Sequence, residues 1–424
     1  MIPFPREPLA AAPRPPRPPL PAAFYRALVG LLLFAFAVTI LIPVVPLFIT
    51  DRLGATEQWI GTATLILAFT AVTSRIPTGT LSDRQGRRRW MLIGALLSLA
   101  ASLFYLASHS IAVFLLARIG TGAALGVFTT ASKALSADLA PPSRRGEALG
   151  LNNATFSVAG IFSPLVGEGL KNALGFEAVF ALSGALSLLA LLVTYTLPAD
   201  HPDMSESNGA RRDAVLALRQ RGTWAAILLI VSAGALLTLM FTFYPLLAER
   251  SALYDDAPRL LAAVAMGLGL SIWSLIDTVI EPVAGRVSDA IGRQPVALPG
   301  LVIAAAGVVL LSRAAGTASA YAAIALMASG WGMMRAIADA IAQDAIPPAL
   351  RGIGTALLYT SFDLAIGINA QLLGGMIDGA DFDAFFTATL ALFLGFGALG
   401  FALATRLRTY TAPQVAPAPT DPAR

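Results

Sequence analysis

Long apolar stretches separated by polar loops run along the whole chain. Each is close to the roughly 20 residues that a helix needs to cross a hydrocarbon core about 30 Å thick. A lipid-exposed backbone must satisfy its own hydrogen bonds, so helices are expected, and the alternating ten-residue strands of an outer-membrane barrel are not seen. The pattern predicts an all-α membrane protein with twelve transmembrane helices, at residues 24–49, 57–78, 90–108, 111–137, 147–170, 176–197, 223–248, 259–283, 296–313, 317–342, 353–376 and 384–405.

The overall composition supports a membrane environment. Hydrophobic residues make up 56% of the chain and charged residues only 13%, with a mean hydropathy of +0.73. Soluble domains carry about a quarter charged residues. Nearly all loops between the apolar stretches are short, so neighbouring helices are expected to be antiparallel.

Three short patterns recur at one offset of 206 residues. Unrelated patterns that keep a single register over more than 100 residues indicate a duplicated unit. The repeated pairs are 79–87 with 285–293, 138–146 with 344–352, and 176–180 with 382–386.

The basic residues are distributed unevenly between the two sides of the predicted membrane. With the N-terminus in the cytoplasm, 20 of the 29 Lys and Arg residues fall on cytoplasmic segments, five lie outside and four lie within spans. This excess predicts a multi-pass protein of a bacterial-type plasma membrane with both termini cytoplasmic. The net charge of +4 then reflects topology, and no nucleic-acid partner is expected. The predicted segments are a disordered Pro-rich tail (1–23), an N-terminal six-helix bundle (24–197), a cytoplasmic linker (198–222), a C-terminal six-helix bundle (223–405) and a tail (406–424).

Several kinds of chemistry have no support in the sequence. The chain has no cysteine, and its two histidines, His109 and His201, lie in separate loops. Neither a cysteine site nor a histidine metal site is therefore expected. No Gly-rich phosphate loop ending in Lys-Ser/Thr is present, which disfavours an ATP-driven pump. We expect no cofactor, no metal and no enzyme activity.

The loop between the second and third spans reads Gly79-x-x-Ser82-Asp83-Arg84-x-Gly86-Arg87-Arg88. It resembles the signature loop of the major facilitator superfamily, and a weaker copy stands between spans eight and nine. The resemblance covers residues 24–405. It implies two six-helix bundles around a central cavity that opens alternately to either side of the membrane.

The repeated loops place acids beside arginines at equivalent positions. Gly79 and Gly86 are expected to permit a tight turn at a helix end and the close approach of a neighbouring helix. Pairs of the loop arginines with Asp138 and of Arg293 with Asp344 would latch the cytoplasmic side shut, and simple positive-inside topology is the alternative reading. The predicted gate residues are Gly79, Asp83, Arg84, Gly86, Arg87, Arg88, Asp138, Arg145, Gly285, Asp289, Gly292, Arg293, Asp344 and Arg351.

Charges inside spans that break the 206-residue register are the candidates for proton coupling or substrate binding. A charge near the bilayer centre costs roughly 2.5–3.5 kcal/mol on insertion scales, so it should face the bundle interior. Asp363 stands near mid-membrane, and its alternative role is a static hydrogen bond. Asp277 and Glu281 lie one turn apart and either share a proton or pair with Arg144 or Arg145. Arg335 and Asp339 are expected to form a structural i,i+4 pair.

Two further polar positions in the spans are candidates. Arg118, followed by Gly120 and Gly122, resembles a span-four motif of the family that is associated with proton coupling. The alternative is an outer-leaflet arginine that reaches the headgroups. Asn152, near the inner end of span five, is a candidate hydrogen-bonding residue of the cavity, with a helix cap as the alternative.

Span five carries Gly160, Pro164 and Gly167, which is similar to the antiporter motif of exporters. Ser163 and Glu168 depart from that motif. The small face predicts close packing against span eight.

These features together predict a proton-coupled exporter of a small amphipathic solute or drug, acting as a monomer in the lipid bilayer. Its cavity is expected between spans 1, 4, 7 and 10. The alternatives are a sugar or metabolite transporter of the same fold and a non-transporting sensor on this scaffold. The aromatic residues predicted to face the cavity are Phe34, Phe36, Phe241, Phe243 and Tyr244.

Overall fold

The computed structural model describes residues 18–199, 216, 218–251, 253–259, 261–345, 351–377 and 382–405. Most of the predicted N-terminal tail, most of the linker and the whole C-terminal tail lie outside the described residues. The described part is helical and contains no strand.

The predicted apolar stretches form twelve long helical units. In the first half these are α1 (Ala22–Thr39) continuing through α2 (Val45–Leu47), then α3 (Gln58–Gln85), α4 (Arg87–Leu106), α5 (Ile111–Leu139), α6 (Arg145–Leu174) and α7 (Phe176–Tyr195). In the second half they are α9 (Arg221–Leu237) continuing into α10 (Tyr244–Arg250), then α11 (Ala265–Ile291), α12 (Gln294–Ser312), α13 (Thr317–Ala345), α14 (Arg351–Ile377) and α15 (Phe382–Thr405).

Eleven of the units in the described part are long and apolar enough to cross a membrane. The helix outside that group is α13, which is 29 residues long. Its length suffices for a span, and it carries the charged residues Arg335, Asp339 and Asp344. Charged residues within a span lower its mean hydropathy and mark a functional position by default. The charges of α13 therefore make it a candidate functional helix.

The first and seventh units are interrupted at the same end of the molecule. Residues Phe48–Arg52 and Thr238–Phe243 are π-helical, and Pro46 and Pro245 begin α2 and α10. Proline removes a backbone donor and breaks the regular ladder. π-helical turns of this kind are frequent at functional sites, and Phe241 of the second turn reaches the cavity described below.

The tight turns of the repeated loops depend on Gly86 and Gly292. Both adopt positive φ, +93° and +96°, between α3 and α4 and between α11 and α12. A side chain in this region costs about 1–2 kcal/mol, which explains why glycine stands at both positions. Gly79 does not form the predicted turn or close approach, and Gly285, its equivalent in the repeat, has similar surroundings. They lie inside α3 and α11, and no described atom lies within 4 Å of where their Cβ would stand.

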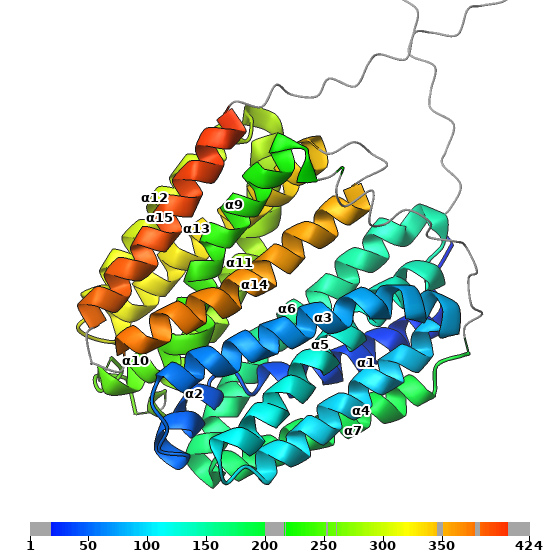
Figure 1. Ribbon diagram of the computed structural model, residues 1–424, viewed down its shortest axis with the longest axis horizontal. Helices are drawn as coiled ribbons and strands as arrows, with labels where there is room; N and C mark the ends of the chain where they lie inside the picture. The colour runs from blue at the N-terminus through cyan, green and yellow to red at the C-terminus, as the bar shows by residue number, and fades with distance from the viewer. Residues whose placement is uncertain are drawn as a thin grey trace, which may run out of the picture.

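The helices form two bundles that lie side by side (Figure 1). Across the boundary α3 packs on α14, and α6 packs on α11. The bundles also meet where α10 contacts α2, at what we call the α10 end. The opposite end, called the Arg87 end, holds the α3–α4 and α11–α12 turns. The fold is that of two six-helix bundles, as predicted.

Candidate functional site

A cavity of about 830 Å³ lies between the two bundles. Residues from α1, α3, α5 and α6 line it on one side, and residues from the α9–α10 unit, α11, α13 and α14 line it on the other. Lys133, Gly150 and Gly285 of the lining lie within two turns of the helix ends at the Arg87 end. The cavity therefore extends from mid-molecule towards the Arg87 end. It is lined by eight helical units rather than the predicted four.

Aromatic rings of the second bundle form one wall of the cavity. Phe241 meets Trp273 edge-on at 6.1 Å, Trp273 lies 6.4 Å from Trp331, and Trp331 stacks on Phe362 at 5.5 Å between ring centroids. We call these four residues the aromatic wall. The first bundle contributes a mixed surface, in which the aromatic Phe156 and aliphatic side chains stand beside polar groups such as Thr129 and Asn153.

Three of the five aromatic residues predicted to face the cavity are packed elsewhere. Phe34 stacks on Phe128 at 4.1 Å inside the first bundle. Phe243 and Tyr244 are fully buried in the core of the second bundle. Phe241 lines the cavity as predicted, and Phe36 is not among its lining residues. Hydropathy alone does not tell which face of an all-apolar helix turns inward.

One arginine in the cavity is shared by two acids. The Arg335 guanidinium lies 3.6 Å from an oxygen of Asp277 and 3.4 Å from an oxygen of Glu281. The second oxygen of Asp277, Oδ1, is buried and has no hydrogen-bond partner among the described residues. A single cation thus faces two carboxylates. The predicted pairing of Arg335 with Asp339 is wrong.

Asp339 and Arg144 have other partners than predicted. The Tyr359 hydroxyl donates a hydrogen bond to Asp339 at 3.0 Å. Arg144 pairs with Glu147 at 2.6 Å and is therefore not the partner of Asp277. The cation that pairs with Asp277 and Glu281 is Arg335 of α13, which lies close to them because α13 packs against α11.

Asp363 joins the two bundles. Its carboxylate accepts a hydrogen bond from Arg75 of α3 at 2.5 Å. Arg75 lines the cavity, whereas Asp363 stands behind it at the α3–α14 contact. Gly367, one turn further along α14, packs against Leu65 of α3. Asp363 therefore has a fixed cation partner, unlike Asp277 and Glu281, which share theirs.

Lys133 of α5 is exposed within the cavity lining. Its amine lies 5.7 Å from the centre of the Tyr359 ring. No ion pair joins it to any carboxylate in the described part of the chain. The sequence contained a signal for this position that our prediction missed: the residue 206 positions later is Asp339, a charge of opposite sign.

Arg118 and Asn152 lie differently from the acids. Arg118 is 9% exposed, and its Nε donates to the backbone oxygen of Ala63 on α3 at 3.3 Å. It is not among the lining residues of the cavity. Asn152 borders the cavity, but its amide donates to Ser132 and Ser136 of α5 at 3.1 and 3.0 Å. In this structure both residues hold helices together.

The predicted gate residues form two ion clusters at the Arg87 end. Arg87 binds both Asp83, at 2.6 Å, and Asp138. Arg293 binds Asp289 and also Asp344, the latter at 2.9 Å.

The two clusters are equivalent in the repeat, and each stays within its own bundle. Burial opposes the charge of Arg293, but the hydrogen bonds from its two carboxylate partners outweigh this and raise its pKa. The role of these clusters as a gate between the bundles stays a prediction. The side chain of Arg351, at the start of α14, lies outside the described residues.

The α10 end is closed by contacts that cross the bundles. The Glu168 carboxylate of α6 accepts the backbone N–H groups of Gly267, at 2.5 Å, and Met266, at 3.3 Å. These groups stand at the start of α11, where the helix dipole favours a negative charge. Asn172 of α6 donates to Ala263 at 2.8 Å.

Two more contacts complete this closure. Arg250 pairs with Glu57 across the bundles. Thr62 of α3 donates to Gln371 of α14 at 2.9 Å.

Glu168 explains a departure from the antiporter-like motif of α6. In the sequence Glu168 is only a deviation from the motif, whereas in the structure it caps a helix of the other bundle. Gly160 lies against Ser274 of α11, as the predicted packing on span eight requires. Gly167 faces the Ile40 backbone of α1 instead. The small face is therefore divided between two neighbours.

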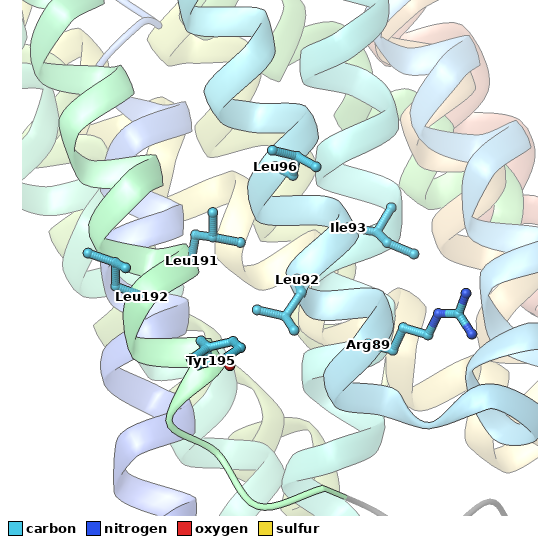
Figure 2. Close-up of a pocket in the computed structure, with 7 residues that line it drawn as sticks. All are labelled: Arg89, Leu92, Ile93, Leu96, Leu191, Leu192 and Tyr195. Atoms are coloured by element: carbon cyan, nitrogen blue, oxygen red, sulfur yellow. The ribbon is translucent and has the colours of Figure 1, made fainter.

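A second hollow lies outside the bundles, between α4 and α7. Figure 2 shows Leu92 and Leu96 of α4 beside Leu191 of α7, with Arg89 turned away from them. Its volume is about 500 Å³, and its lining is apolar apart from Arg89 and Tyr195. Such a surface suits contact with lipid chains and has none of the charged groups of the central cavity. Within the described residues no group of three or more His, Asp or Glu side chains is placed to hold a metal ion.

Comparisons with known proteins agree with this architecture. The family profile described as Major Facilitator Superfamily matches residues 27–370 and 257–422. An uncharacterized MFS-type transporter, MJ1560 of Methanocaldococcus jannaschii, is 23% identical over 334 residues, covering 77% of this chain and 84% of that protein. The quinolone resistance protein NorA of Staphylococcus aureus is 26% identical over 186 residues, which is 43% of this chain and 46% of NorA.

Solved structures show the same fold. A bacterial homologue of the human lysosomal transporter Spinster, in an inward-facing and occupied conformation, has a TM-score of 0.75 at 15% identity, covering 92% of this chain and 98% of that one. The nucleoside transporter NupG has a TM-score of 0.74 at 12% identity, covering 90% and 99%. With the family profile spanning nearly all of the helical region, this chain belongs to the Major Facilitator Superfamily and is a multi-pass membrane transporter of that type.

Proposed function

We propose that this protein is a secondary transporter of a bacterial cell membrane, which exports a small amphipathic solute in exchange for protons. It works as a monomer by alternating access, because one chain contains the whole cavity. The observation that carries the proposal is that the bundles are in contact at the α10 end, while the cavity extends to the Arg87 end.

The glycines on the inner faces support two alternating packings. At the α10 end they are in close contact across the bundles: a Cβ on Gly61 would lie 2.2 Å from the Ala370 oxygen, and one on Gly267 would lie 2.6 Å from the Pro164 oxygen. At the Arg87 end, Gly150 and Gly285 have no described atom within 4 Å of such a Cβ. Because α6 and α11 are partners across the boundary, these free positions let the helices approach when the Arg87 end closes.

The orientation of the molecule follows from its basic loops. The Arg87 end carries most of the arginines, so it is the cytoplasmic end by the positive-inside rule. The structure then represents an inward-facing state, open to the solute that an exporter collects. Both termini are cytoplasmic in this orientation.

Proton coupling is assigned to the group formed by Asp277, Glu281 and Arg335. Deprotonation of the shared pair leaves one carboxylate charge without a cation in the cavity, and this change alters which state is favoured. One proton moving through 100 mV supplies about 2.3 kcal/mol, enough for roughly a fifty-fold gradient of a neutral solute. The Arg75–Asp363 pair links α3 to α14 near mid-membrane and helps to hold the bundles in register.

Export is favoured over import by two independent features. The antiporter-like glycines and proline of α6 are typical of exporters, and the match to NorA falls on a protein named for quinolone resistance.

The aromatic wall suits an amphipathic solute better than a sugar, because ligand pockets for apolar solutes are lined mainly by aromatic and apolar groups.

The test is proton release from energised everted vesicles that contain the protein, challenged with amphipathic acids, lipophilic cations and sugars. Collapse of the pH gradient by one class, lost in Asp277→Asn and kept in the matched Asp51→Asn, supports the proposal. Asp51 lies in the π-helical turn that precedes α3, away from the cavity. Downhill flux without proton movement would reject coupling. A protein that binds solutes but moves none would be a sensor.

A further inference from the structure

We propose that the cavity binds an amphipathic organic anion, whose acidic group pairs with Lys133 and whose aromatic part packs on the aromatic wall. The inference rests on the proposed function only in taking this cavity as the transport site. It names the class of solute, and it is carried by the way the charges of the cavity are distributed.

Three of the acids in or beside the cavity pair with arginines, and the fourth, Asp339, accepts a hydrogen bond from the Tyr359 hydroxyl at 3.0 Å. Asp363 is bound by Arg75 at 2.5 Å, and Asp277 and Glu281 share Arg335 at 3.6 and 3.4 Å. To pair with Asp277, Glu281 or Asp363, a cationic solute would have to displace an arginine from its carboxylate, and to pair with Asp339 it would have to compete with the Tyr359 hydroxyl. Burying the displaced guanidinium without its partner is strongly unfavourable, so the cavity disfavours a simple cation.

Lys133 is in the opposite situation. It is an exposed residue of the cavity lining, and its amine forms no ion pair with a described residue. An ammonium carries three donors and no acceptor. A charge within a membrane span that lacks an ionic partner marks a functional site by default. A carboxylate or similar acidic group would provide both the missing charge and the missing acceptors.

Tyr359 contacts both Lys133 and the acid Asp339. Its hydroxyl donates to Asp339 at 3.0 Å, while its ring lies 5.7 Å from the Lys133 amine. No ion pair joins Lys133 to Asp339 in the described part of the chain. The Tyr359 ring offers Lys133 a cation–π contact, which is weaker than a salt bridge and leaves the donors available.

The position of Lys133 relative to the aromatic wall determines which groups the solute must carry. Lys133 stands on α5 of the first bundle, and Trp273, Trp331 and Phe362 stand on the second. A solute that uses both must carry an aromatic ring and an acidic group. It then bridges the two bundles, so its binding is sensitive to their relative movement.

The chain offers a matched control, because it contains only two lysines, Lys133 and Lys171. Lys171 lies on α6 at the α10 end, 5.9 Å from the Phe176 ring and outside the cavity lining. Binding is measured on the purified full-length protein with three probes of one shape: 3-phenylpropanoate, its amide and 3-phenylpropylamine.

We expect the acid to bind about ten-fold or more tightly than the amide, the range expected for a hydrogen bond to a charged group. This preference should persist in Lys171→Gln and disappear in Lys133→Gln. Lys133→Arg should keep it, and Lys133→Glu should reverse it in favour of the amine. In Lys171→Gln, the acid should also protect Lys133 from an amine-reactive label. An unchanged melting temperature shows that the variants fold.

Equal binding of acid and amide, tighter binding of the amine, a preference that survives Lys133→Gln, or no binding of the acid would each overturn the inference. Vesicle flux separates this result from the proposed function. If amines are exported with proton exchange while the acid does not bind, the transporter stands and the anion class falls. If the acid binds through Lys133 but no solute is ever moved, the binding site stands and the transport proposal falls.

Discussion

The Glu168 carboxylate is expected to hold the α10 end closed, and Glu168→Ala tests this directly. Glu168 belongs to the first bundle and caps the first turn of α11 in the second. It is 6% exposed, so water compensates little for its loss. The variant leaves the start of α11 without its acceptor only in the state closed at this end, and therefore shifts the balance towards the outward-open state.

The size of the shift follows from the two hydrogen bonds. Hydrogen bonds to a charged group contribute about 1.5–3 kcal/mol, and replacing a helix-capping side chain by Ala costs about 1 kcal/mol. The bond to Gly267 is short at 2.5 Å, and the bond to Met266 is long at 3.3 Å. We take about 2 kcal/mol for the whole contact, which changes the ratio of closed to open molecules about 30-fold.

The assay uses the absence of cysteine from the chain. Ala370→Cys places a single thiol on α14, at a fully buried position opposite Gly61 of α3. A membrane-impermeant maleimide added from outside then reports the fraction of time that this end is open. We expect labelling about 30-fold faster in Glu168→Ala. Glu177→Ala is the control, because Glu177 pairs with Arg52 of its own bundle and is 56% exposed.

A labelling rate unchanged by Glu168→Ala would refute the reasoning. It would mean that Arg250–Glu57 and the glycine contacts alone keep this end closed. An equal acceleration in Glu177→Ala would also refute it, because the effect would then be general loosening of the α10 end.

Three further predictions concern other parts of the molecule. Gly285→Leu fits the present structure, because no described atom lies within 4 Å of where a Cβ at this position would stand. The larger side chain should nevertheless block closure of the Arg87 end and reduce transport at least about ten-fold. Normal transport with intact expression would contradict this. Gly86→Ala should lower the free energy of unfolding by about 1–2 kcal/mol, measured in denaturant, because φ is +93° there; an unchanged midpoint would argue against the strained turn. Hydrogen bonds from the Thr317 hydroxyl and amide hold the pKa of Asp256 below its usual value, so their contribution to stability is present above the pKa of the unfolded chain and is lost as pH falls through the folded-state pKa. Asp256→Asn should therefore lower the melting temperature at neutral pH and lose that difference in acid, and a difference that does not vary with pH would oppose this sign.

The sequence was sufficient for the helices, the duplication and the turn glycines. The apolar stretches predict each helix from its own residues, and the repeat relates the two halves by sequence alone. Neither inference depends on how the helices pack against one another. Gly86 and Gly292 lie where predicted because a positive φ is a local requirement. The ion clusters around Arg87 and Arg293 also contain the predicted acids, since the residues of both clusters lie at helix ends on one side of the molecule.

The inner surface of the cavity was harder to predict. Helices in lipid are apolar on every face, so no periodicity distinguished Phe241, which lines the cavity, from Phe243 and Tyr244, which do not. The partner of Arg335 was predicted from helix spacing, but the acids of α11 lie closer once the helices pack. The Glu168 cap was missed because it joins residues about 100 positions apart, and no local pattern records such a contact.

The duplication also has a consequence for how the two halves can be combined. Where the first half has Arg75 and Lys133, the second has Glu281 and Asp339 at the equivalent positions. Two copies of the first half would bring four cations together in the cavity, and two copies of the second would bring four extra acids. Like charges in a low-dielectric space repel strongly. The halves have thus diverged into an electrostatically complementary pair, so that neither can any longer replace the other and a working molecule requires one of each.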